Sequence, residues 1–126
     1  MKILIVDDES SARVMLERKL AQYNNIINGI QHADGVKSAL RTLEEDDFDL
    51  IFLDIQMPDG TGFDLLEKMQ DKQALVAFTT AHDEFALKAF EFAAIGYLLK
   101  PVDSEKLDVV MQMACQMKQN RKNLAN

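Results

Sequence analysis

Short apolar runs alternate five times with stretches of helical periodicity along this chain of 126 residues. The runs are rich in Ile, Leu and Val and have the length of buried strands. The stretches between them carry apolar residues at the i, i+3, i+4 and i+7 spacing of an amphipathic helix. Strict strand–helix alternation is typical of a parallel sheet covered by helices on both faces. The pattern therefore predicts an α/β fold: a doubly wound (βα)5 sandwich around a five-stranded parallel sheet.

The predicted elements fall into five strand–helix pairs. The strands are expected at Lys2–Val6, Ile26–Ile30, Leu50–Leu53, Leu75–Thr79 and Gly96–Leu99. The helices are expected at Ser11–Tyr23, from Val36 to Leu43, from Phe63 to Met69, at Glu84–Ala93, and from a cap at Asp103 to Met117. One domain then spans residues 1–118, and residues 119–126 are expected to be a polar tail or the start of a linker to an output domain.

Charge and hydropathy exclude several classes of partner. The formal net charge of −7 argues against nucleic-acid binding by this domain, because a nucleic-acid footprint needs clustered Lys and Arg. No apolar run is long enough to cross a bilayer, and the N-terminal run reaches Asp7 and Asp8 too soon for a secretory signal. The single Cys115 is compatible with a reducing compartment. We therefore expect a cytoplasmic protein without membrane or direct nucleic-acid contacts.

Polar residues follow four of the five predicted strands. Crossovers between parallel strands are right-handed, so all strands point their carboxyl ends at the same edge of the sheet. Ligands bind at that edge, in the crevice where the strand order reverses. Topology therefore predicts that one site gathers residues far apart in the sequence, namely Asp7, Asp8, Glu9, Asp54, Thr79, Thr80 and Lys100.

This set of side chains suits phosphoryl transfer to a carboxylate. Three neighbouring carboxylates repel one another, and a divalent cation with oxygen ligands such as Mg²⁺ relieves the repulsion. Lys100 supplies a second positive charge, and the hydroxyl of Thr80 can donate to a phosphoryl oxygen. An ionised carboxylate needs no general base before it attacks phosphorus. We therefore expect Asp54 to be the nucleophile, with Asp7 and Asp8 holding the metal.

The sequence resembles the receiver domains of two-component response regulators over nearly its whole length. The matching segments are ILIVDDE, FLDIQMPDGTGFDLL, the pair Thr80-Ala81, and GYLLKP, in this order and spacing. The resemblance implies a flavodoxin-like or CheY-like sheet of strand order 2-1-3-4-5. The segment FTTAHDEFALKAFEFAAIGYLLKP further resembles receivers of the LytTR (LytR/AlgR) subfamily, which implies an output domain that regulates transcription.

The resemblance assigns roles to the residues of the metal site. Asp54 would accept the phosphoryl group from a cognate histidine kinase or from a small phosphodonor. Asp8 would bind Mg²⁺ (or Mn²⁺) directly, Asp7 largely through water, and Gln56 through its main-chain carbonyl. The protein would not be an enzyme beyond self-catalysed phosphotransfer and autodephosphorylation.

The resemblance also assigns residues to a phosphoryl-responsive switch. Thr80 would bond the phosphoryl group and follow it inward, Tyr97 would be the aromatic switch, and Lys100 would bind the phosphoryl oxygens. The Lys100–Pro101 peptide would be cis. Thr79 competes with Thr80 for its role, and an aromatic residue on an outer strand such as Tyr97 can also be plain packing.

The fourth predicted helix carries more apolar surface than one neighbour can cover. A helical wheel places a core-facing arc at Phe85, Ala86, Ala89, Phe90 and Ala93. Leu87 and Phe92 extend the apolar surface beyond that arc. Exposed apolar patches commonly mark protein contacts. We therefore predict a homodimer or partner surface built from helix four, strand five and helix five, with Phe85, Leu87 and Phe92 in the interface.

Two other functions compete with this interpretation. A haloacid-dehalogenase-like phosphohydrolase also uses an Asp nucleophile, a Thr, a Lys and Mg²⁺, but it attacks from an Asp-x-Asp motif that Asp7-Asp8-Glu9 lacks. A receiver-shaped module could bind partners without phosphorylation. Neither His32 nor His82 has metal-ligand neighbours in the sequence, so both are expected on the surface. His82 and Gln56 lie close enough to the site to influence the lifetime of the phosphoryl group.

Overall fold

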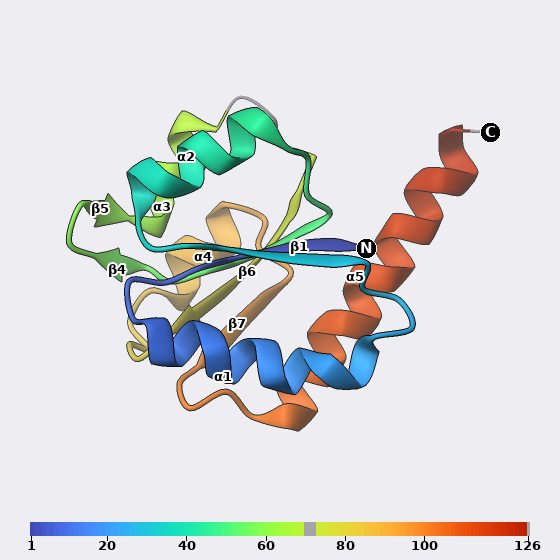
Figure 1. Ribbon diagram of the computed structural model, residues 1–126, viewed down its shortest axis with the longest axis horizontal. Coiled ribbons are helices and arrows are strands. Elements are labelled where there is room, and N and C mark those ends of the chain that lie inside the picture. The colour runs from blue at the N-terminus through green and yellow to red at the C-terminus, as the bar shows by residue number, and fades with distance from the viewer. Residues whose placement is uncertain (70–72, 126) are drawn as a thin grey trace.

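The computed structural model describes residues 1–69 and 73–125, and five of its strands form one parallel sheet. The sheet order is β2-β1-β3-β6-β7, which is the predicted order of the five strands along the sheet (Figure 1). Its strands are β1 Lys2–Val6, β2 Gly29–Ala33, β3 Leu50–Leu53, β6 Leu75–Thr80 and β7 Gly96–Leu99. The reversal of strand order lies between β1 and β3, so the ligand crevice is expected beside the ends of these two strands.

Helices cover both faces of the sheet. One face carries α1 Ser10–Leu20 and α5 Ser104–Ala125, and a short 3-10 helix, η1 Ala21–Tyr23, extends α1. The other face carries α2 Val36–Glu45, α3 Gly62–Lys68 and α4 Ala86–Glu91. Figure 1 shows α1 and α2 on opposite sides of the sheet.

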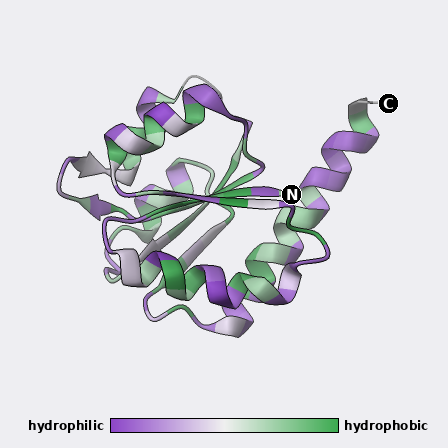
Figure 2. Cartoon of the chain, viewed as in Figure 1, coloured by the Kyte–Doolittle hydropathy of each residue, from purple (hydrophilic) through white to green (hydrophobic). Residues whose placement is uncertain are grey.

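Alternation along each strand sends side chains to two separate cores. In β1, Leu4 points to the core shared with α2 and α3, whereas Ile3 and Ile5 point to the core shared with α1 and α5. All of these side chains are at most 2% exposed. Burial of one such side chain contributes about 1.5–3 kcal/mol to the stability of the fold. Figure 2 shows the hydrophobic strands at the centre of the molecule. The paired cores hold the strand ends in fixed register.

A small hairpin connects β3 to α3. Its strands are β4 Gln56–Met57 and β5 Gly60–Thr61, where the sequence indicated only a turn. Gly60 has a φ of 146°, which residues with side chains rarely adopt. Thr61 and Asp64 then form a capping box that begins α3. A Cβ atom on Gly62 would lie 2.6 Å from the carbonyl oxygen of Asp54, so glycine allows α3 to begin directly against the predicted nucleophile.

The second strand was predicted three residues too early. The structure places β2 at Gly29–Ala33, whereas Ile26 and Ile27 lie in the loop after η1 and pack against the core of α1 and α5. The strand lies at an edge of the sheet and includes the polar residues Gln31 and His32. Its apolar pattern is therefore weaker than that of the loop before it.

The last helix is longer than the sequence indicated. Asp103 caps it as predicted, because its Oδ1 accepts a hydrogen bond of 2.8 Å from the Glu105 N–H. The helix continues through the expected polar tail to Ala125, and its free end is largely hydrophilic in Figure 2. Within residues 1–69 and 73–125, no helix has both the length and the apolar character needed to span a membrane.

Candidate functional site: an acidic cluster at the carboxyl edge of the sheet

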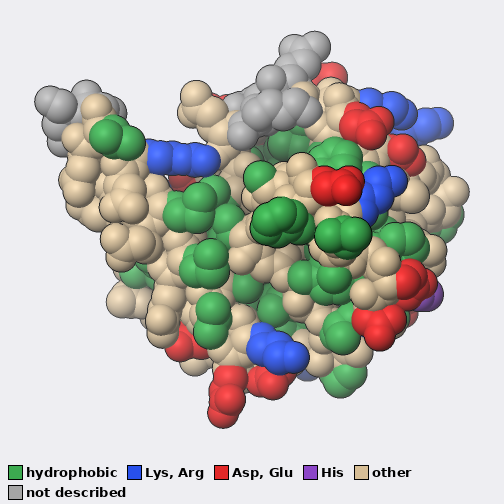
Figure 3. Space-filling view, turned by 180° about the vertical axis from the view of Figure 1, so that it is seen from behind, with side chains coloured by type: hydrophobic (Ala, Val, Ile, Leu, Met, Phe, Trp, Pro, Cys, Tyr) green, Lys and Arg blue, Asp and Glu red, His purple; other side chains and the backbone are tan. Residues whose placement is uncertain are grey.

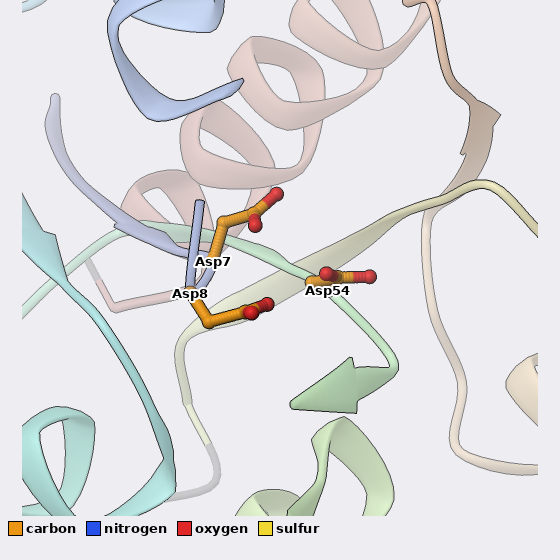
Figure 4. Close-up of side chains that lie close together, drawn as sticks. All are labelled: Asp7, Asp8 and Asp54. Carbon is orange, nitrogen blue, oxygen red and sulfur yellow. The ribbon is translucent and has the colours of Figure 1, made fainter. Parts of the chain in front are cut away.

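Three aspartates converge at the ends of β1 and β3. Asp7, Asp8 and Asp54 each place a carboxylate oxygen within 4.8 Å of the others (Figure 4). Asp7 and Asp54 directly follow the paired residues Val6 and Leu53, so the strand register brings them to the same level. Asp7 is 3% exposed and Asp54 is 6% exposed, while Asp8 is open to solvent. The convergence predicted from topology is thus confirmed for these three aspartates.

Lys100 is the cation beside these carboxylates. Its Nζ lies 2.6 Å from Oδ2 of Asp7 and 3.3 Å from Oδ2 of Asp54. Burial and the charge of Asp7 raise the pKa of Asp54 above its ordinary value, and Lys100 only partly offsets this. Burial opposes the charge of Lys100, but its hydrogen bond to Asp7 and the charge of Asp54 outweigh that cost, so its pKa is raised. Lys100 thus remains a cation.

The end of β7 carries Lys100 to this position. The Lys100 N–H donates to the carbonyl oxygen of Thr80 at 2.8 Å, which extends the pairing of β6 with β7 by one step. The Lys100–Pro101 peptide is cis, as the resemblance implied. Residues 101–103 then lead from the lysine to α5.

Thr80 and Tyr97 both bond to the main chain of His82. Thr80 is fully buried, and its Oγ1 accepts a hydrogen bond of 3.2 Å from the His82 N–H. The Tyr97 hydroxyl donates to the carbonyl oxygen of the same residue, His82. Thr79 instead faces the side of α1, where it lines a small cavity together with Ile5, Asp7 and Lys100. Of the two threonines, Thr80 thus lies on the side of Tyr97.

The donor set fits a hard divalent cation. Carboxylate oxygens within 4.8 Å of one another are the ligands that Mg²⁺ and Mn²⁺ take in proteins. Gln56, the predicted carbonyl ligand, begins β4 two residues after Asp54. The Gly62 N–H donates to the carbonyl oxygen of Ile55 at 2.8 Å, which holds the hairpin against the start of α3.

The α4 surface differs from the helical-wheel prediction. Phe90 was placed in the core but is 79% exposed, and Phe92 was placed on the surface but packs against the ring of Phe63 at 5.2 Å. The reason is that Phe85, Ala89 and Phe92 follow one another at i, i+4 and i+7 and share one helical face, so the face that meets the core centres on Phe85 and Ala89 and leaves Phe90 in solvent. The Phe85 ring also contacts Phe63, with centroids 6.3 Å apart.

Exposed apolar side chains nevertheless gather on this side of the molecule. Leu87 is 76% exposed, and Leu99 at the end of β7 is 41% exposed. On α5, Val109 and Met113 are 56% and 42% exposed. Figure 3 shows hydrophobic side chains distributed over the face made by α4, β7 and α5. The predicted elements of the surface are present, with Phe90 in place of Phe92.

Contacts on the other side of the cluster were missed by the sequence analysis. Arg13 Nη1 donates to the carbonyl oxygen of Asp7 at 2.6 Å, and Arg13 Nε donates to His32 Nδ1 at 3.3 Å. His32 Nε2 lies 2.6 Å from a carboxylate oxygen of Glu17. His32 is therefore half-buried and paired. The four-residue spacing of Arg13 and Glu17 on one helix was the available signal.

Asp59 is a second residue that sequence reasoning missed. Its two carboxylate oxygens accept hydrogen bonds from the N–H groups of Val36 and Lys37, at 2.9 and 3.0 Å. These bonds lower the pKa of Asp59 and cap the N-terminus of α2 from the hairpin. A Cβ atom on Gly35 would lie 2.7 Å from Asp59 Oδ1, so glycine leaves room for the cap.

Comparisons with known proteins agree with this geometry. The response regulator receiver domain family matches residues 3–112. The sensory transduction protein LytR of Staphylococcus epidermidis is 40% identical over 125 residues, covering 98% of this chain and 49% of that protein. The positive alginate biosynthesis regulatory protein of Pseudomonas aeruginosa is 39% identical over 127 residues, covering 99% of this chain and 50% of that protein. The chain thus spans about half the length of these curated relatives.

Two solved structures are similar to this one in their three-dimensional fold. The response regulatory domain of protein mrkE from Klebsiella pneumoniae has a TM-score of 0.83 and 29% identity, covering 94% of this chain and 99% of that one. The response regulator TrrA from Thermotoga maritima, solved in complex with Mg²⁺-BeF, has a TM-score of 0.75 and 26% identity, covering 90% of this chain and 97% of that one. The family match spans most of the sequence, and the observed sheet order is the one that the resemblance to receiver domains implied. This chain therefore belongs to the receiver domains of two-component response regulators.

Proposed function

We propose that this receiver is a phosphorylation-dependent switch in which Asp54 accepts a phosphoryl group from a cognate histidine kinase or a small phosphodonor. The observation that carries the proposal is the position of Asp54. It is buried at the strand-order reversal, with two carboxylates and the ammonium group of Lys100 around it. A buried aspartate with a raised pKa is costly to a fold, and such groups concentrate at functional sites.

The proposed reaction requires positioning rather than proton transfer. A carboxylate oxygen of Asp54 forms a bond to phosphorus while the bond from phosphorus to the donor's nitrogen or oxygen breaks, and the leaving group departs with that electron pair. Asp7, Asp8, Asp54 and the carbonyl of Gln56 would hold Mg²⁺ or Mn²⁺, which neutralises phosphoryl oxygens when bound. Lys100 would neutralise a further oxygen. Water later hydrolyses the acyl phosphate at the same site, which returns the receiver to its unphosphorylated state. Both steps would be catalysed by the receiver itself.

The proposed readout begins at Thr80. A phosphoryl group adds about −1.5 to −2 charges and strong acceptor oxygens. The Thr80 hydroxyl can donate to one of them. Movement of Thr80 would pull on the His82 N–H, and the carbonyl oxygen of His82 holds the Tyr97 hydroxyl. This short chain of contacts would link the phosphoryl group to β7 and to the loop before α4.

We further propose that the readout surface is the exposed apolar face of α4, β7 and α5. Leu87, Phe90 and Leu99 are candidate contacts for a second copy of the chain. Phe85 and Phe92, which pack against Phe63, would hold α4 in place rather than form the contact itself. The curated relatives are about twice as long, so an output domain that controls transcription would respond to this change.

Intact mass spectrometry after treatment with acetyl phosphate and Mg²⁺ tests the proposal. The wild type should gain the mass of one phosphoryl group, whereas Asp54→Asn should gain none. An unmodified wild type would favour a receiver-shaped module that works without phosphorylation. The family match argues against a haloacid-dehalogenase-like phosphohydrolase. Turnover of a generic phosphate ester would instead favour that phosphohydrolase.

A further inference from the structure

The side chain of Arg13 contacts the acidic cluster at the main-chain carbonyl group of Asp7. Its Nη1 donates to the carbonyl oxygen of Asp7 at 2.6 Å, a short hydrogen bond from a charged donor. Neither the proposed metal site nor the proposed reaction uses this arginine. A cation near the N-terminus of α1 is also disfavoured by the helix dipole. The position of Arg13 is therefore not explained by the stability of the helix.

Two more residues fix the direction of the guanidinium group. Arg13 Nε donates to His32 Nδ1 at 3.3 Å, which requires a histidine ring with its proton on Nε2. That Nε2 lies 2.6 Å from the carboxylate of Glu17, which follows Arg13 by four residues on α1. Glu17, His32 and Arg13 thus form a continuous chain of contacts from α1 across β2 to Asp7. The planar guanidinium group holds two of its partners at once, which a lysine could not do with the same geometry.

We propose that Arg13, held by His32 and Glu17, is a positioning residue that orients Asp7 and Asp8 for metal binding. The carbonyl oxygen that Arg13 binds belongs to the peptide group between these two aspartates. Fixing that peptide plane fixes the directions in which both side chains leave the main chain. The inference rests on the proposed function, because it requires the acidic cluster to bind Mg²⁺.

Asp8 depends most on this orientation. The Asp7 carboxylate is also held by the Glu9 N–H at 3.0 Å and by Lys100 at 2.6 Å. Asp8 is exposed, so the orientation of its main chain is what directs its carboxylate toward the others. Residues that orient metal ligands from outside the coordination shell commonly change metal affinity by about 10–100-fold when replaced.

The positioning role and a simple charge effect predict opposite signs. A guanidinium group beside three carboxylates repels a divalent cation, so charge alone predicts that its removal strengthens Mg²⁺ binding. Loss of positioning predicts weaker binding. A purely structural role predicts a lower melting temperature of the metal-free protein with Mg²⁺ affinity unchanged.

Isothermal titration calorimetry with Mg²⁺ on the full chain separates these cases. We expect Arg13→Gln to bind Mg²⁺ about tenfold more weakly than the wild type. We expect His32→Ala to bind it about fivefold more weakly, as after the loss of one supporting hydrogen bond. Arg18→Gln is the matched control, because it removes the same charge from an exposed position of the same helix. Its Mg²⁺ affinity should equal that of the wild type.

Phosphorylation by acetyl phosphate gives a second readout. The Mg²⁺ concentration for half-maximal rate should rise about tenfold in Arg13→Gln, while the rate at saturating Mg²⁺ should stay within about twofold of the wild type. Unchanged or tighter Mg²⁺ binding in Arg13→Gln would overturn the inference. If that variant does not fold, wild-type affinity in His32→Ala would overturn it equally. A wild type that binds no Mg²⁺ would instead refute the proposed function, and this inference with it.

Discussion

The acidic edge of the sheet and the α4 surface are held in different ways. At the edge, Asp7 alone makes contacts through its N–H, its carbonyl oxygen and both carboxylate oxygens, to Ala33, Arg13, Glu9 and Lys100. By contrast, α4 has six residues and begins without a side-chain cap.

The comparison indicates how one domain can combine fixed chemistry with a movable surface. Groups that react must be held closely in place, and the strand ends do this. A short helix with few caps and many exposed side chains opens at low free-energy cost. Its attachment through Phe85 and Phe92 to Phe63 is apolar and non-directional, so a second packing arrangement is possible there. We therefore expect the same disturbance to have unequal effects in the two regions.

Removal of the cation at the acidic edge should have the largest effect. In Lys100→Met, phosphoryl oxygens lose a charged donor, and we expect the phosphorylation rate with acetyl phosphate at saturating Mg²⁺ to fall about 100-fold. Lys118→Met is a matched control, because Lys118 pairs with Asp49 at the opposite end of β3. That control should react like the wild type. Equal rates for Lys100→Met and the wild type would remove Lys100 from the proposed reaction.

A methyl group added at the acidic edge should be poorly tolerated. In Gly62→Ala the new Cβ would meet the Asp54 carbonyl oxygen at 2.6 Å, and we expect a loss of about 2 kcal/mol in the free energy of unfolding. In Gly29→Ala the nearest atom would lie 3.6 Å away, so this variant serves as the control. Urea denaturation of both metal-free variants gives the comparison. A Gly62→Ala protein as stable as Gly29→Ala would mean that the acidic edge can rearrange at little cost in free energy.

Variants of Phe92 and Phe90 should separate the packing role of α4 from its role as a contact surface. Phe92→Ala removes packing against Phe63 and should cost about 2 kcal/mol, less than a fully buried phenylalanine. Phe90→Asp changes a side chain that is 79% exposed, so stability should stay within about 0.5 kcal/mol of the wild type. Sedimentation with Mg²⁺ and beryllofluoride should nevertheless detect weaker association in Phe90→Asp. Unchanged association there would exclude this face as the dimer contact.

The pH dependence of stability should reveal the cost of the acidic edge. Burial and the Asp7 charge raise the Asp54 pKa in the folded protein, so its contribution is most favourable below the ordinary pKa and is lost as pH rises through the raised value. Asp54→Asn should therefore raise the metal-free melting temperature at pH 7 by about 2–5 °C. The gain should vanish below about pH 4, where both states protonate the aspartate. Thermal melts across this range test this, and a variant less stable than the wild type at pH 7 would mean that the Asp54 charge does not destabilise the fold.

The strands and the reactive edge could be predicted because topology decides them. The bounds of β1, β3 and β7 agree with the sequence prediction, since buried parallel strands are continuous apolar runs. Once these strands are placed, Asp54 and Lys100 must meet at one edge.

The missed features depend on tertiary contacts. His32 was expected on the surface because its partners, Arg13 and Glu17, come from another element. The roles of Phe90 and Phe92 were exchanged because the core-facing arc was centred too close to Phe90, whereas packing against Phe63 selects the face that carries Phe85 and Phe92. The edge strand β2 has too little apolar character to be distinguished from the loop before it.

Hydrogen exchange of the main-chain amides, measured with and without Mg²⁺ and beryllofluoride, tests most directly whether a fixed edge drives a movable surface. We expect activation to change protection in residues 82–93 and in β7, while the amides of α2 exchange at the same rate in both states. A response confined to the ends of β1 and β3, with α4 unchanged, would contradict it.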